Sequence, residues 1–139
     1  MKLEATKLQV FLYSFANMID DIGIDDAVKK GEAILKELGG EKVDIVPLET
    51  TDESLINDLT LIEVTDEFIF IYQRKSSEIL RFARNGKFLN KIGRKGQGPG
   101  EYTYIGGLQI DESKSEVYAI TTANGVLVYG FEGTFKRQI

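Results

Sequence analysis

The sequence lacks the residue types on which many catalytic and metal sites depend. Its 139 residues include no cysteine and no histidine. The absence of cysteine excludes disulfides and thiolate nucleophiles, and the absence of both residues excludes Cys/His zinc sites. A Ser-His-Asp triad within one chain is excluded because it needs a histidine. We therefore assign no catalytic, metal-binding or cofactor-binding residue and expect no cofactor.

Proline, tryptophan and long apolar runs are also scarce. There are two prolines and no tryptophan, whereas the 14 glycines indicate many tight turns. No apolar run approaches the ~20 residues that a membrane-spanning helix needs, so no transmembrane segment is expected. Lys2 and Lys7 precede an apolar stretch, but Glu4 lies between these cations and no small-x-small cleavage site follows. We expect an amphipathic or frayed segment here rather than an export signal.

The residues that are present form an ordinary globular composition with uneven charge. Hydrophobic residues make up 42% and charged residues 28%, as expected of one soluble domain. The net charge is −5, yet eight bases lie between Arg74 and Lys95, with Glu78 as the single acid among them. We interpret this basic stripe as solvated strand faces and turns, with binding of an anionic polysaccharide as a weaker hypothesis. No nucleic-acid-binding motif is present, and no nucleic acid partner is expected.

Residues 1–41 are predicted to form a helical N-terminal segment. Asp25 or Asp26 can cap the stretch DDAVKKGEAILKELGG, in which apolar residues recur with helical spacing. Gly39-Gly40 end this pattern. The acids between Asp20 and Asp26 form adjacent pairs rather than the alternating ligands of a calcium loop. We therefore interpret them as capping and solubilising residues.

Residues 42–139 have the hydrophobic period of β-strands. VDIVPLE, at 43–49, predicts a short strand, and Pro47 suits an edge position. FIFIY, at 68–72, is nearly all apolar, as expected of a strand that is buried on both faces. Asn85-Gly86 separates two further strand patterns and is a strong hairpin signal.

A repeat with a spacing of 47 residues divides this β-rich part in two. Residues 69–92 align with 117–139 after one gap, so that Gly86 matches Gly133. Repeats of about 40–50 residues with four strands each are typical of β-propeller blades, which bury their faces by stacking on one another. The predicted fold class is thus mainly β, with two four-stranded propeller blades after the helical segment. The predicted blades span about 59–92 and 105–139.

The glycine-rich stretch GRKGQGPGEY, at 93–102, invites comparison with phosphate-binding loops. A dinucleotide fingerprint built on Gly98 and Gly100 needs a third glycine where Thr103 stands, and a helix must follow. A strand pattern follows instead, and Pro99 removes a backbone donor that a phosphate would need. We therefore interpret the stretch as the connection between the two blades.

Within this connection the glycines are expected to supply positive φ, and Pro99 is expected to stiffen the crossing. Glu101 is expected to accept backbone N–H bonds or to pair with a cation, and Tyr102 to wedge between the blades. The candidate inter-blade loop contacts are Arg94, Lys95, Gln97, Glu101 and Tyr102. The expected structural turn residues are Gly86, Gly96, Gly98, Pro99, Gly100 and Gly133.

These motifs also resemble a known family. GKFLNKIGRKGQGPGEY, preceded by IFIY and ILRF, resembles the first blades of the six-bladed β-propeller proteins of Bacteroidetes, which are related to NHL-type propellers. VDIVPLETTDESLINDL is similar to the segment before their first blade. The resemblance covers residues 43–139 and implies the N-terminal two-blade portion of a six-bladed ring, with 43–49 as a latch strand. Such proteins usually carry a lipoprotein-type export signal with a cysteine, which is missing here, so no compartment is predicted.

Together these observations favour a binding or interaction scaffold without enzymatic activity. The ligand is left open between a carbohydrate and a protein. The alternative is a glycan- or lactone-acting hydrolase or lyase with its site in the channel of a complete propeller, which rests on analogy of fold alone. Open blade faces and an unpaired edge would be exposed in a two-blade chain. We therefore expect the missing blades of a longer chain, self-association into a closed ring, or a helical segment that covers one face.

Overall fold

The computed structural model describes residues 29, 33, 37, 46–58 and 60–139. The chain divides into two compact units, Met1–Leu48 and Glu49–Ile139. The helical segment predicted for 1–41 lies outside the described residues except at three isolated positions, so it stays a prediction. Residues 46–49 belong to no strand, so the described part of the expected latch strand is not formed. Within the described residues, no helix is long and apolar enough to cross a membrane.

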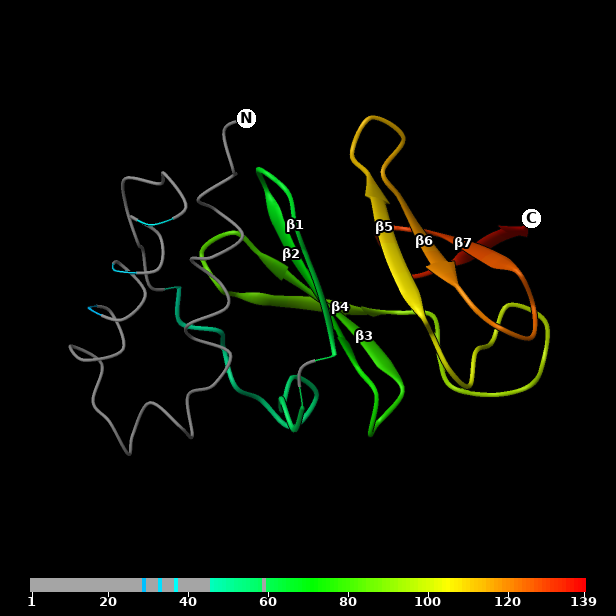
Figure 1. Cartoon of the computed structure of the whole chain (residues 1–139), viewed down its shortest axis with the longest axis horizontal. Coiled ribbons are helices and arrows are strands. Elements are labelled where there is room, and N and C mark those ends of the chain that lie inside the picture. Colours follow the sequence, from blue (N-terminus) through cyan, green and yellow to red (C-terminus); the bar gives the residue numbers. More distant parts are fainter. Residues whose placement is uncertain (1–28, 30–32, 34–36, 38–45, 59) are drawn as a thin grey trace. The chain divides into compact units, whose positions relative to one another are not determined.

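The described residues of the second unit form two four-stranded antiparallel sheets, in which strands that follow one another in sequence are neighbours (Figure 1). The first sheet contains β1 (Leu61–Val64), β2 (Phe68–Gln73), β3 (Glu78–Ala83) and β4 (Phe88–Ile92). The second sheet contains β5 (Gly107–Asp111), β6 (Glu116–Ile120), β7 (Val126–Gly130) and β8 (Phe135–Gln138). The two four-stranded sheets expected from the repeat are therefore present.

The core of this unit lies between the two sheets. Phe70 and Tyr72 of β2 belong to one buried cluster with Tyr129 of β7. Because side chains alternate along a strand, Ile69 and Ile71 point to the other face of the first sheet, and both are fully buried. β2 is thus buried on both faces, as its continuous apolar sequence predicted. Each large apolar side chain buried in this way contributes roughly 1.5–3 kcal/mol.

The two sheets repeat each other in backbone detail. A bulge interrupts the pairing of the last two strands beside Arg81 in the first sheet and beside Val128 in the second. Bulges of this kind increase the local twist of a sheet. The turns that follow contain Gly86 with φ 93° and Gly133 with φ 100°, a region that glycine enters at little cost. The repeat in the sequence is therefore also a structural repeat.

Tyr102 fastens the connection between the sheets. Its buried hydroxyl donates a hydrogen bond to the carbonyl of Ile92 at 2.7 Å and accepts one from the backbone N–H of Ile79 at 3.2 Å. Its ring meets the ring of Tyr129 edge-on, with 6.1 Å between centroids. Tyr102 thus bonds to the first sheet and packs on the second. Burial raises the pKa of Tyr102 well above its usual range, so the hydroxyl keeps its proton.

An ionic cluster lies on the face of the second sheet that points away from the first. Val117 and Ala119 of β6 belong to the core between the sheets, so their neighbours Glu116 and Tyr118 project from the opposite face. The Glu116 carboxylate accepts two bonds from the Arg137 guanidinium, at 2.8 and 3.0 Å, and one from the Tyr118 hydroxyl at 2.7 Å. These bonds, that of Arg137 first, lower the pKa of Glu116 to about 2.

We predict that Tyr102→Phe lowers the free energy of unfolding by roughly 1–3 kcal/mol, because two buried backbone groups lose their shared partner. The measurement is urea denaturation followed by circular dichroism. Tyr104→Phe is the matched control, since Tyr104 is partly exposed and no hydrogen bond of its hydroxyl is described. Equal stability of the two variants would contradict the role of the Tyr102 hydroxyl.

We also predict an acid-sensitive contribution from Glu116. Its pKa is lowered in the folded state, so its contribution is complete above about pH 5 and is lost as the pH falls toward about 2. The difference in unfolding free energy between the wild type and Glu116→Gln should therefore shrink over this window. Arg137→Gln should weaken the pH dependence of the unfolding free energy in the same way. The double variant should be little less stable than either single variant. If the stability of Glu116→Gln fell with pH as steeply as that of the wild type, Glu116 would not be the group responsible.

Candidate functional site

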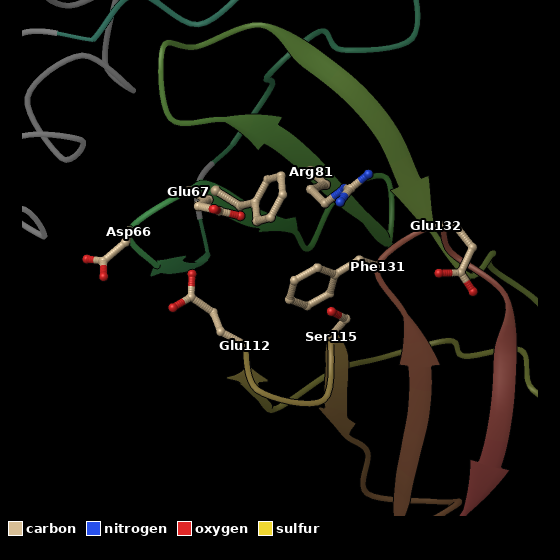
Figure 2. Close-up of a pocket in the computed structure, with 8 residues that line it drawn as sticks. Asp66, Glu67, Arg81, Glu112, Ser115, Phe131 and Glu132 are labelled. Atoms are coloured by element: carbon tan, nitrogen blue, oxygen red, sulfur yellow. The ribbon is translucent and has the colours of Figure 1, made fainter.

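A cleft of about 610 Å³ opens between the two sheets (Figure 2). It lies at the end where the β1–β2, β5–β6 and β7–β8 turns meet. Its volume is within the range of small-molecule sites, which are usually about 300–1,000 Å³. Its walls come from both sheets, so the cleft exists only when the sheets are packed together. The residues that line it are Asp66, Glu67, Phe68, Arg81, Glu112, Ser115, Phe131 and Glu132.

Aromatic rings form the apolar wall of the cleft. The Phe131 ring, from the second sheet, lies 5.4 Å from the ring of Phe68 and 5.3 Å from that of Phe70 in the first sheet, measured between centroids. Phe131 and Phe68 meet edge to face, an arrangement that aromatic pairs prefer. Phe131 is 8% exposed, so its ring is held in place by packing. The cleft thus has a preformed aromatic side.

Arg81 is stacked against this wall. Its guanidinium carbon lies 4.7 Å from the Phe68 centroid and 5.8 Å from the Phe131 centroid. Its Nε donates a hydrogen bond to Oδ1 of Asn90 at 2.8 Å, and Nδ2 of Asn90 donates to the Phe131 carbonyl at 3.0 Å. Asn90 therefore ties the guanidinium to the backbone of the other sheet. Burial lowers the pKa of Arg81 and the charge of Glu132 opposes that shift, but a guanidinium stays protonated near neutral pH.

Carboxylates form the rim of the cleft. Asp66 and Glu67 are at the tip of the β1–β2 hairpin, while Glu112 and Glu132 come from turns of the second sheet. Figure 2 shows Glu67 and Glu112 on facing sides of the opening. A hydrogen bond from the Thr134 hydroxyl is the main cause that lowers the pKa of Glu132. Four carboxylates against one guanidinium make the rim acidic and rich in hydrogen-bond acceptors.

Short turns fix the positions of these carboxylates. The β1–β2 hairpin closes with the backbone N–H of Thr65 bonded to the Phe68 carbonyl at 2.9 Å, and with the Phe68 N–H bonded to the Thr65 hydroxyl at 3.0 Å. The carbonyl of Glu67 accepts a bond from the backbone N–H of Arg84 at 2.8 Å, which holds the tip against the next hairpin. Across the described part of the chain, no group of three or more acidic side chains is placed to hold a metal ion.

The loop contacts predicted from sequence lie at the other end of the sheets. The connection at 93–102 follows β4 and precedes β5, and Figure 1 shows it opposite the β5–β6 turn that borders the cleft. Arg94, Lys95 and Gln97 are exposed there, whereas Tyr102 is buried between the sheets. None of these residues lines the cleft.

Glu101 organises the turn in this connection. Its carboxylate accepts a bond from the Gly98 N–H at 2.9 Å and one from Arg94 Nε at 2.6 Å, and these bonds, the backbone one first, lower its pKa. The expectation of positive φ holds for Gly93, with φ 63°, and for Gly100, with φ 71°, but is wrong for Gly96 and Gly98. Gly96 is needed for a different reason, because a Cβ there would collide with the Glu101 carboxylate.

The cleft residues were missed by the sequence analysis because they come from separate turns. One signal was available. The acidic pairs Asp66-Glu67 and Asp111-Glu112 follow the first strand of each repeat. Turns that occupy equivalent places in adjacent sheets lie at the same end of the sheets. The two acidic pairs could therefore have been predicted to lie on the rim of one site.

The chain has recognisable relatives. A crystal structure of a Bacteroides fragilis protein, described provisionally as exported, is similar with a TM-score of 0.58 and 32% sequence identity. The match covers 68% of this chain and 28% of that protein, so the chain spans well under half of its length. No match was found among curated proteins. Residues 19–139 match the family described as a domain of unknown function, DUF4934, over most of the chain. The chain therefore belongs to the DUF4934 family.

Proposed function

We propose that the two sheets are consecutive blades of a β-propeller and that the chain is a ligand-binding scaffold rather than an enzyme. The order of each sheet supports this proposal, since each is a four-stranded meander. The first strands of the two sheets, β1 and β5, lie against each other, as neighbouring blades around one axis require. The relative from Bacteroides fragilis supports the Bacteroidetes part of the resemblance.

The cleft is the observation that carries the binding function. Its aromatic wall offers the partly exposed ring of Phe68 as an apolar surface, and its rim offers carboxylates that accept hydrogen bonds but do not donate them. A matching ligand needs an apolar face together with several hydrogen-bond donors. A carbohydrate meets both needs, because the C–H face of a sugar ring packs on an aromatic ring while its hydroxyls bond to carboxylates. We therefore propose a neutral or amino sugar as the ligand.

The alternative of a hydrolase or lyase has weaker support. Glycoside hydrolysis needs one carboxyl group that stays protonated near neutral pH and acts as a general acid. The pKa of Glu132 is lowered, which favours a permanent negative charge at this position. Glu132 therefore does not fit the role of the general acid, and binding without reaction is the function that we propose.

A propeller ring also needs further blades beyond these two. Ile120 and Ile139, on the outer face of the second sheet, are 38% and 69% exposed. Val126 lies between them, because it pairs with Ile120 and exchanges backbone hydrogen bonds with Ile139. An exposed apolar row on a sheet face is a surface that another sheet can bury. We propose that a further blade, from a longer chain or from another copy, packs on this row.

We predict that the chain alone self-associates in solution through this row, and that Ile120→Lys reduces the association. The measurement is light scattering on a size-exclusion column, with Thr122→Lys as a control that adds the same charge at an exposed turn. A monodisperse monomer for the wild type would contradict the proposed need for another blade.

Titration of the ¹⁵N-labelled protein with a panel of neutral and amino oligosaccharides tests the cleft. We expect amide shifts that gather at 65–68, 112–115 and 131–134. Glu67→Gln should weaken binding about tenfold, since a hydrogen bond to a charged group contributes roughly 1.5–3 kcal/mol. Glu53→Gln, an exposed carboxylate that does not line the cleft, should leave binding unchanged. Shifts elsewhere, or none with any sugar, would refute the proposal.

A further inference from the structure

Four basic side chains gather at the end of the sheets that lies opposite the cleft. Arg74 and Lys75 are in the β2–β3 turn, and Arg94 and Lys95 are in the connection before β5. All four are exposed. The sheet order places this turn and this connection at the same end, and Figure 1 shows both below the sheets. We call this surface the basic end.

Backbone contacts bring the two basic pairs to opposite sides of one short segment. On one side, Lys95 forms a parallel bridge with Tyr102, and the Tyr102 N–H donates a bond to the Arg94 carbonyl at 3.2 Å. On the other side, the hydroxyl of Ser77, in the β2–β3 turn, donates to the Thr103 carbonyl at 2.9 Å. These contacts therefore fix the backbone positions of the two basic pairs relative to one another.

An aromatic ring completes this surface. The Arg74 guanidinium carbon lies 5.1 Å from the centroid of the Tyr104 ring. Tyr104 is 37% exposed, although it is a large aromatic residue. A cation over a ring is an attractive pair that also orients the guanidinium. The basic end thus presents an oriented positive charge beside an apolar ring.

Two carboxylates lie near these cations and leave a positive surplus. Glu101 pairs with Arg94 at 2.6 Å. Asp58 accepts the backbone N–H groups of Arg74 at 3.2 Å and Lys75 at 3.3 Å, so it fixes the turn rather than pairing with the two side chains. The side chains of Arg74, Lys75 and Lys95 form no ion pair with another described residue.

We propose that the basic end binds an acidic polysaccharide. This site is separate from the cleft and does not depend on the carbohydrate proposed there. Carboxylate groups along such a chain would pair with Lys75, Lys95 and Arg74, while a sugar ring packs beside Tyr104. The acidic rim at the other end repels the same polysaccharide, so the polysaccharide would contact the protein at the basic end alone. In the sequence the eight bases form one stripe, whereas in the fold four of them lie together at the basic end.

The geometry favours a polysaccharide over a nucleic acid. Proteins that bind single-stranded nucleic acid offer several aromatic rings on which successive bases stack. At the basic end, Tyr104 is the aromatic ring that a described contact places beside a cation. Phe135 is also exposed, at 41%, but it lies against Gly100 of the connection and its ring packs on that of Tyr129. The surface is also built from a turn and an irregular connection, which present no helix or strand ribbon to a duplex groove.

The test is binding of polygalacturonate to the full chain by isothermal titration calorimetry at about 50 and 500 mM salt. We expect binding at low salt that weakens strongly at high salt. The triple variant Arg74→Gln, Lys75→Gln, Lys95→Gln should lose at least about tenfold in affinity. The control variant Lys87→Gln, Lys114→Gln, Lys136→Gln removes the same charge elsewhere and should lose less than about twofold.

Three results would overturn the proposal. The first is no binding of polygalacturonate at low salt. The second is an equal loss in the two triple variants, which would mean that net charge alone drives binding. The third is equal or tighter binding of a single-stranded DNA of matched charge, which would assign the surface to nucleic acid. Circular dichroism of both variants checks that their fold is intact.

Discussion

The packing of the first sheet against the second is the constraint on which the rest of the described structure depends. A single four-stranded sheet with Phe70 and Tyr72 on one face and Ile69 and Ile71 on the other cannot bury both faces by itself. Once the second sheet covers one face, the cleft forms at one end of the interface and the connection closes the other end. Tyr102, in this connection, links the two sheets, since it bonds to the first and packs on the second.

The sequence was sufficient to predict the strands because their signals are local and occur twice. The period of two and the matching glycines Gly86 and Gly133 located the two sheets, and both glycines have the positive φ that their turns need. The cleft was not predictable in the same way, because its side chains become neighbours only when two sheets meet. Gly96 shows a similar limit, since its small size serves a contact with Glu101 rather than a backbone conformation.

The residues of the basic stripe are separated in space when the chain folds. Antiparallel strands send successive turns to alternate ends of a sheet, so a continuous stretch of sequence is divided in space. Arg81 became part of the cleft wall, Lys91 paired with Glu78 at 2.7 Å, and Arg74 reached the far end beside Tyr104. The described part of the second unit therefore has an acidic rim at one end of its strands and a basic surface at the other.

Asn90 couples the cleft to the angle between the two sheets. Its side chain holds the Arg81 guanidinium with one atom and the Phe131 carbonyl of the other sheet with another. A rotation of one sheet against the other would therefore move the cation and change the width of the opening together. Any ligand that prefers one width must then also prefer one angle between the sheets, and by thermodynamic reciprocity a change in that angle alters the affinity for the ligand. Occupancy of the cleft and the angle between the sheets are therefore governed by one equilibrium.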